Sequence, residues 1–129
     1  MKNNRGKQYG YRSGFEHTVN AELQALGIDG KYEATVLQFE QPAKKRKYTP
    51  DFQLPNGIFI ETKGRFTMED RQKHVHIRES LPDIDIRFVF MNANAKLRKG
   101  AKTTYADWCE KNNFKYATKS IPSDWIEEI

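Results

Sequence analysis

The chain has 129 residues, of which 37% are hydrophobic and 12% aromatic. This length and aromatic content favour one folded domain with one core and exclude a disordered composition. Lysine and arginine number 22 against 17 aspartates and glutamates, and the net charge of +5 favours a polyanionic partner such as nucleic acid. The single cysteine, Cys109, excludes an intrachain disulfide, and no apolar run predicts a membrane span or signal peptide. We expect a soluble protein of a reducing compartment.

The N-terminal region divides into a basic stretch and a helix. Residues 1–12, which end at Arg12, predict either a disordered tail or an arm that contacts phosphates. Apolar residues then recur at helical spacing up to Gly27, a suitable C-cap, and Ser13 can cap the start of this helix. Glu16 stands where a capping box would place it, and the local pattern favours that role. A carboxylate in the first turn could equally point into a neighbouring cleft and bind a cation.

A strand and a basic connection are predicted next. Side chains alternate from Lys31 to Phe39, which indicates a strand. The following segment, Gln41 to Lys47, contains a proline and should be an exposed connection. It ends in four consecutive basic residues, Lys44, Lys45, Arg46 and Lys47. Such a run is usually a solvated surface, and the alternative is contact with nucleic-acid phosphates.

The stretch from Tyr48 to Gly64 carries the strongest indication of chemistry. Asp51 follows a proline, and Glu61 and Lys63 are two residues apart on a predicted strand. Pro-Asp, a spacer and then Glu-x-Lys is the pattern of the PD-(D/E)xK nuclease core. Because short motifs match by chance, an ordinary exposed hairpin with solvated charges also fits this pattern taken alone.

The turn between the two acidic residues decides whether they can meet. A two-residue Asn-Gly turn would place Glu61 on the opposite face from Asp51. In a three-residue loop with Pro55-Asn56 as a type I turn and Gly57 left-handed, Leu54 pairs with Ile58 and Asp51 faces Glu61. Proline at the first turn position favours this second register. Cross-strand Cβ atoms lie about 5 Å apart, close enough for both carboxylates to ligate one divalent cation.

The segment after the motif predicts a crossover unit. Ile58 to Ile60 is apolar on successive residues, as in a strand covered on both faces. A helix is expected over Thr67 to Ser80 and a second apolar strand over Ile84 to Met91, which gives a βαβ crossover. The side chains expected to face the core from this helix are Met68, His74 or Val75, and Ile77 or Leu81. The fold class is therefore α/β, a mixed sheet flanked by helices.

Basic residues also follow the motif. The crossover helix carries Arg71, Lys73 and His74, which are candidates for DNA contact. His74 and His76 fall on different helical faces, which is poor geometry for joint metal ligation, so we interpret these two as packing or phosphate-contacting side chains. The loop from Asn92 to Lys102 contains three further candidates for DNA contact, Lys96, Arg98 and Lys99. A solvated loop is the alternative.

The C-terminal region predicts core closure. Thr103 or Thr104 can cap a short helix, a strand is expected over Phe114 to Ala117, and Pro122 begins a last helical turn. Cys109 on the short helix should be buried and inert, because no motif marks it as a nucleophile.

Seven motifs together resemble phage endonuclease I of the T7 type, a family of resolvases that cleave four-way DNA junctions. They are Arg12-Ser-Gly-Phe-Glu16, Tyr48-Thr-Pro-Asp-Phe52, Leu54-Pro-Asn-Gly-Ile58, Glu61-Thr-Lys-Gly64, Asp70-Arg-x-Lys-His74, Asp85-Ile-Arg-x-Val-Phe90 and Ile121-Pro-x-x-Trp-Ile126. The resemblance runs from about Arg12 to the C-terminus. It implies a restriction-endonuclease-like PD-(D/E)xK core in an element-swapped homodimer.

In that family each active site is built from both chains. The resemblance implies one nuclease domain over 13–129, in which residues 13–39 are exchanged through a bridge at about 39–47. Glu16 would be donated by the partner chain to Asp51, Glu61 and Lys63, and the carbonyl of Thr62 would be a further metal ligand. The bridge is more basic than is typical of T7-type members, and their basic C-terminal tail has no counterpart before Ile129.

The implied function is resolution of four-way junctions and other branched DNA by paired nicks. Two Mg²⁺ ions per site, for which Mn²⁺ can substitute, would be held by Asp51 with Glu61 and by Asp51 with Glu16. Lys63 should stay protonated beside the carboxylates, which favours an electrostatic role over that of a general base. The alternatives are a PD-(D/E)xK restriction or repair nuclease acting on duplex DNA and a non-catalytic junction-binding protein. We expect a cytoplasmic location, in the host cell for a phage-encoded protein.

Overall fold

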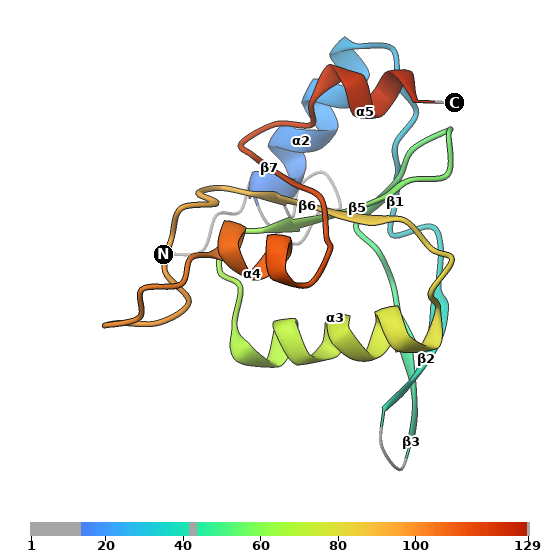
Figure 1. Ribbon diagram of the computed structural model, residues 1–129. Helices are drawn as coiled ribbons and strands as arrows, with labels where there is room; N and C mark the ends of the chain where they lie inside the picture. Colours follow the sequence, from blue (N-terminus) through green and yellow to red (C-terminus); the bar gives the residue numbers. More distant parts are fainter. Residues whose placement is uncertain (1–13, 42–43, 129) are drawn as a thin grey trace.

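The computed structural model describes residues 14–41 and 44–128, and its centre is a mixed five-stranded sheet in the order β1-β4-β5-β6-β7. A separate pair, β2 and β3, projects away from this sheet (Figure 1). The strands are β1 (Lys31–Tyr32), β2 (Leu37–Gln41), β3 (Lys44–Tyr48), β4 (Phe52–Gln53), β5 (Phe59–Lys63), β6 (Ile86–Phe90) and β7 (Tyr116–Thr118). The helices are α2 (Gly14–Ala25), α3 (Met68–Ser80), α4 (Tyr105–Lys111) and α5 (Ser123–Glu127). The predicted α/β class, a mixed sheet flanked by helices, is confirmed.

Helices cover both faces of the sheet and create two cores. On one face α2 and α5 pack Leu23 and Trp125 against Ile60 and Val89 (Figure 1). On the other face α3 and α4 cover a largely aromatic core that includes Phe66 and Phe88. Because side chains alternate along a strand, neighbouring residues of β5 and β6 enter different cores. This explains why the predicted apolar runs lack alternation.

The hairpin that joins β4 to β5 has the three-residue turn. Phe52 pairs with Ile60 and Gln53 with Phe59, and the Leu54 amide donates to the Ile58 carbonyl at 2.8 Å. Gly57 has a φ of +93°, which a residue with a side chain rarely adopts. The prediction of this turn is confirmed. Continuing the register by one step sets Asp51 opposite Glu61.

The predicted βαβ crossover is also confirmed, since β5 and β6 are parallel neighbours joined through α3. Thr67 caps α3 in a capping box with Asp70, and His74 and Ile77 are its buried side chains. Met68 was expected in the core, but it is 61% exposed: it is the first residue of α3, and the buried side chains of this helix, His74 and Ile77, lie in its later turns. In the part of the chain that the structure describes, no helix is both long and apolar enough to cross a bilayer.

Two predictions before the motif are wrong. The strand expected over Lys31 to Phe39 is broken at Glu33, whose φ of +45° turns the chain out of β1 and away from the sheet. The connection expected over Gln41 to Lys47 is partly β3, which pairs antiparallel with β2. Pairing between the two segments satisfies backbone groups that a simple exposed connection would leave to water. The tip of this hairpin, 42–43, lies outside the described residues.

Candidate active site

Asp51 is fixed by hydrogen bonds from Thr62 on the neighbouring strand β5. Its Oδ2 atom accepts hydrogen bonds from the Thr62 amide at 2.8 Å and from the Thr62 hydroxyl at 2.9 Å. The side chain is only 2% exposed. A buried carboxylate fixed by two donors presents its remaining oxygen in a defined direction, as a metal ligand requires.

Glu61 is buried on β5 next to an aromatic hydroxyl. Tyr48, itself buried, donates a hydrogen bond from its hydroxyl to Glu61 Oε1 at 2.8 Å. Burial first, and then the charge of Asp51, raise the pKa of Glu61 from 4.5 to about 8. Lys63, Tyr48 and Lys73 act in the opposite direction. A bound cation would offset the burial and the repulsion from Asp51 that disfavour the ionised carboxylate. Metal binding requires this deprotonated form, so a cation would stabilise it.

Lys63 lies between two carboxylates. Its Nζ atom is 3.6 Å from Glu61 Oε2 and 3.5 Å from Asp70 Oδ1. Burial alone would lower the Lys63 pKa, but the charges of Glu61, Asp70 and Asp51 outweigh it and leave the pKa above its ordinary value. A raised pKa agrees with an ammonium that stays protonated, and the electrostatic role of Lys63 stays a prediction.

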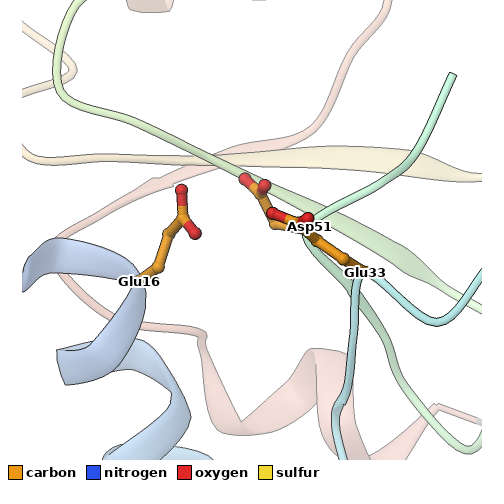
Figure 2. Close-up of side chains that lie close together, drawn as sticks. All are labelled: Glu16, Glu33 and Asp51. Carbon is orange, nitrogen blue, oxygen red and sulfur yellow. The ribbon is translucent and has the colours of Figure 1, made fainter. Parts of the chain in front are cut away.

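Glu16 points from α2 toward Asp51, and a third carboxylate joins them. Oxygen atoms of Glu16, Glu33 and Asp51 all lie within 4.8 Å of one another. Figure 2 shows the three side chains converging from α2, from the bend after β1 and from the start of β4. Tyr32 donates its hydroxyl hydrogen bond to Glu16 Oε2 and so fixes the buried glutamate. Its carboxylate thus lies beside Asp51 and Glu33, as the cation-binding role of the two weighed for Glu16 requires, and that role stays a prediction. Ser13, its expected capping partner, lies outside the described residues.

Glu33 was missed from the sequence. The alternation of Lys31 to Phe39 made it an ordinary outward-facing strand residue, and no spacing signal marked it. In the structure Glu33 leaves the strand geometry, its amide donates to the Asp51 carbonyl at 3.0 Å, and its side chain is half-buried. A non-glycine residue with positive φ is strained and often belongs to a functional site.

Carboxylate oxygens are the ligands that Mg²⁺ and Mn²⁺ prefer, and the chemistry of this donor set fits such a cation. Among the described residues, Glu61 stands beside the group of three rather than inside it, with its carboxylate engaged by Tyr48 and Lys63. Asp51 lies within 4.8 Å of both Glu16 and Glu33, and its charge also acts on Glu61. The Thr62 carbonyl as a ligand stays a prediction.

The predicted DNA-contacting residues are spread over several elements. Arg12 lies outside the described residues, and so do the side chains of Lys44, Lys45 and Arg46, although these three belong to β3. Lys47 on β3 and the loop residues Lys96, Arg98 and Lys99 are exposed. On α3, Arg71 donates to the Phe66 carbonyl at 2.7 Å, and Lys73 lies over the Tyr48 ring. Of the two helix residues, Lys73 lies close to the site, since Tyr48 donates to Glu61.

His74 has the packing role of the two that were predicted. It is 1% exposed and its ring meets Tyr48 and Phe88 edge-on. Burial lowers the His74 pKa well below its ordinary value, so the ring is neutral. As a phosphate contact His74 was predicted wrongly, because its ring belongs to the aromatic core. Cys109 is buried as expected, and burial raises the pKa of its thiol to about 12.

Comparison with known proteins assigns the chain to a family. The sequence model of the phage endonuclease I family matches residues 1–129. The chain belongs to this family. It is 48% identical over 118 residues to Endonuclease I of Escherichia phage T7, which covers 92% of this chain and 79% of that protein. It is 47% identical over 118 residues to Endodeoxyribonuclease 1 of Enterobacteria phage T3, covering 92% of this chain and 78% of that protein.

The family membership confirms the resemblance drawn from the motifs. It also covers the elements that carry the site, since the family match includes α2, the bend at Glu33 and β5.

Proposed function

We propose that this protein is a metal-dependent endodeoxyribonuclease that resolves four-way junctions and other branched DNA. The observation that carries the proposal is the convergence of Glu16, Glu33 and Asp51 within 4.8 Å beside Glu61 and Lys63. The relatives are named as an endonuclease and an endodeoxyribonuclease, which supports DNA as the substrate. The net charge of +5 fits a polyanion.

Phosphodiester hydrolysis requires a nucleophilic water and stabilisation of negative charge at phosphorus and at the leaving oxygen. A divalent cation, Mg²⁺ or Mn²⁺, supplies both when it is bound between carboxylates. Asp51 and Glu61 would hold one such ion, with the Thr62 carbonyl, and Glu16 with Asp51 would hold a second, which Glu33 also reaches. Tyr48 keeps Glu61 oriented toward the site, since its hydroxyl donates at 2.8 Å.

Lys63 supplies a fixed positive charge within this acidic environment. Its ammonium would lie against a phosphate oxygen, where a preorganised cation stabilises the charge that develops during the reaction. The pKa of Lys63 is above its ordinary value, so this charge is present at neutral pH. Glu61, by contrast, gives up its proton when a cation binds.

The proposed assembly is a homodimer that exchanges 13–39 between chains. In the single chain, Glu16 already reaches Asp51, and β2 and β3 form an antiparallel hairpin. Opening of this hairpin into a bridge over 39–47 would let α2 and β1 make the same contacts with a second chain. Two sites in one dimer would account for paired nicks in opposing strands.

Mixing two inactive chains tests this exchange. A chain with Glu16→Gln and a chain with Asp51→Asn, refolded together, should recover cleavage, because the hybrid dimer has one site with both carboxylates intact. Each chain refolded alone is the control and should stay inactive. No recovery in the mixture would contradict the exchange, since a site completed within one chain always keeps one defect.

The proposed activity is tested on two substrates of matched sequence, a synthetic four-way junction and a linear duplex. We expect paired nicks in the junction with Mg²⁺ and no cutting with EDTA. Equal cutting of both substrates would indicate a duplex nuclease, and binding without cutting would indicate a junction-binding protein. Cutting in EDTA would contradict the metal-dependent mechanism.

A further inference from the structure

The first turn of α3 lies beside the candidate active site and touches it through one side chain. Asp70 approaches Lys63 Nζ to 3.5 Å with its Oδ1 atom. Its other oxygen, Oδ2, accepts a hydrogen bond from the Thr67 amide at 3.0 Å, and the Asp70 amide donates to the Thr67 hydroxyl at 3.1 Å. One carboxylate therefore belongs both to the helix cap and to the ion pair.

From this geometry we propose that Asp70 is the positioning residue for Lys63, an inference that rests on the proposed function. Lys63 has a flexible four-carbon side chain. If its ammonium were paired with one carboxylate alone, it would move whenever that carboxylate moved. Its other partner, Glu61 at 3.6 Å, is the carboxylate proposed to bind a cation. When Glu61 turns to a cation, Asp70 is the contact that keeps the ammonium in the site.

Asp70 suits this task because it is itself fixed. In the capping box the amide and the carboxylate of Asp70 are both hydrogen-bonded to Thr67. The Asp70 carboxylate is therefore already ordered before DNA binds. It lies in the first turn of a helix of 13 residues, where the helix dipole favours a negative charge. The side chains of Asp70 and Lys63 are 27% and 21% exposed, so solvent screens the pair only in part.

A second capping box in the chain provides a matched control. Thr104 and Asp107 at the start of α4 make the same pair of hydrogen bonds, at 3.0 Å and 3.1 Å. Asp107 forms no ion pair with a lysine or arginine among the described residues. Asp70→Asn and Asp107→Asn therefore alter the same type of cap, but only the first removes a carboxylate from Lys63.

Two measurements on wild type and both variants separate positioning from capping. The first is the single-turnover rate of junction cleavage at saturating protein and Mg²⁺. We expect a fall of about 10- to 100-fold for Asp70→Asn, the usual effect of a misplaced catalytic group. Asp107→Asn should cut at the wild-type rate, with an equal shift of the thermal midpoint in both variants. Equal cleavage rates for the two variants would overturn the proposal.

The second measurement does not depend on cleavage. The side-chain ammonium of Lys63 is followed by ¹H–¹⁵N correlation NMR and assigned through the absence of its signal in Lys63→Met. The spectra are recorded in a Glu61→Gln background, which removes the other carboxylate from Lys63. A protected ammonium signal is expected there with Asp70 intact and with Asp107→Asn, and its loss with Asp70→Asn. Its persistence in Asp70→Asn would overturn the inference. If wild type did not cut DNA at all, the proposed function would fail, and this signal would still decide whether Asp70 holds Lys63.

Discussion

Replacing Glu61 by Gln should stabilise the metal-free protein while removing its proposed activity. Burial and the charge of Asp51 raise the Glu61 pKa from 4.5 to about 8 in the folded protein. Between these two values the folded state binds more protons than the unfolded state, so its stability falls as pH rises. Glutamine has no proton to lose and is free of this effect.

The size of the effect follows from the pKa difference. One pKa unit corresponds to about 1.4 kcal/mol, and pH 7 is about 2.5 units above the ordinary pKa of a glutamate. The buried Glu61 therefore lowers the free energy of unfolding at pH 7 by at most about 3 kcal/mol, relative to acidic pH. A domain of this size changes its thermal midpoint by about 3–5 °C per kcal/mol. The Glu61→Gln variant should therefore unfold about 10 °C above wild type at pH 7 and at the same temperature as wild type near pH 4.5.

The assay is thermal unfolding in EDTA at pH values from about 4.5 to 9, repeated with Mg²⁺. Magnesium should raise the midpoint of wild type more than that of Glu61→Gln, because the variant lacks one ligand of the first ion and keeps Glu16, Glu33 and Asp51 for the second. Glu79→Gln, at an exposed position of α3, is the control and should follow wild type throughout. Parallel midpoints of wild type and Glu61→Gln over the whole pH range would refute the reasoning.

Three further substitutions test neighbouring parts of the structure. Tyr48→Phe should raise the Mg²⁺ concentration for half-maximal cleavage about tenfold, because a hydrogen bond to a charged group contributes about 1.5–3 kcal/mol. An unchanged Mg²⁺ titration would count against the hydrogen bond from Tyr48 to Glu61. Glu33→Gln should slow cleavage about 10- to 100-fold with unchanged junction affinity in Ca²⁺, and wild-type cleavage would remove Glu33 from the site. Arg87→Ala removes a buried guanidinium that binds Asp85 and Glu128, and should lower the free energy of unfolding in urea by about 3 kcal/mol; a change below about 1 kcal/mol would contradict this.

Local rules account for the parts of the site that lie close together in the sequence. Pro55, Asn56 and Gly57 specify one turn, and that turn determines the register that sets Asp51 opposite Glu61. The apolar run before Glu61, the helical pattern from Thr67 to Ser80 and the second apolar run likewise indicated β5, α3 and the parallel crossover. These features depend on neighbours within a few residues, which a single sequence displays.

The remaining features depend on contacts between distant segments. Glu33 reaches the site because the chain leaves β1 at a left-handed residue, a conformation that tertiary contacts impose against its local preference. The roles of Tyr32 and Tyr48 are equally hidden, since each hydroxyl finds a carboxylate 16 or 13 residues away. Alternation around Tyr32 predicts a strand, and neither the sequence around Tyr32 nor that around Tyr48 gives information about the hydroxyl partners.

Buried acidic groups explain why this arrangement needs a cation. Asp51, Glu61 and Glu16 are all less than a tenth exposed, and like charges held together in a protein interior oppose ionisation. Tyr32, Tyr48 and Lys63 compensate only in part, as the raised pKa of Glu61 shows. The chain retains this unfavourable cluster, which is the usual signature of a site selected for chemistry rather than stability.

The most direct test of the central claim is a measurement on Asp51→Asn, because Asp51 connects Glu16 and Glu33 with Glu61. Junction affinity is measured in Ca²⁺ and cleavage in Mg²⁺, with the same four-way junction in both. We expect wild-type affinity together with a loss of cleavage. Cleavage at the wild-type rate, or loss of binding to the same extent as cleavage, would contradict the claim that these carboxylates form the catalytic metal site.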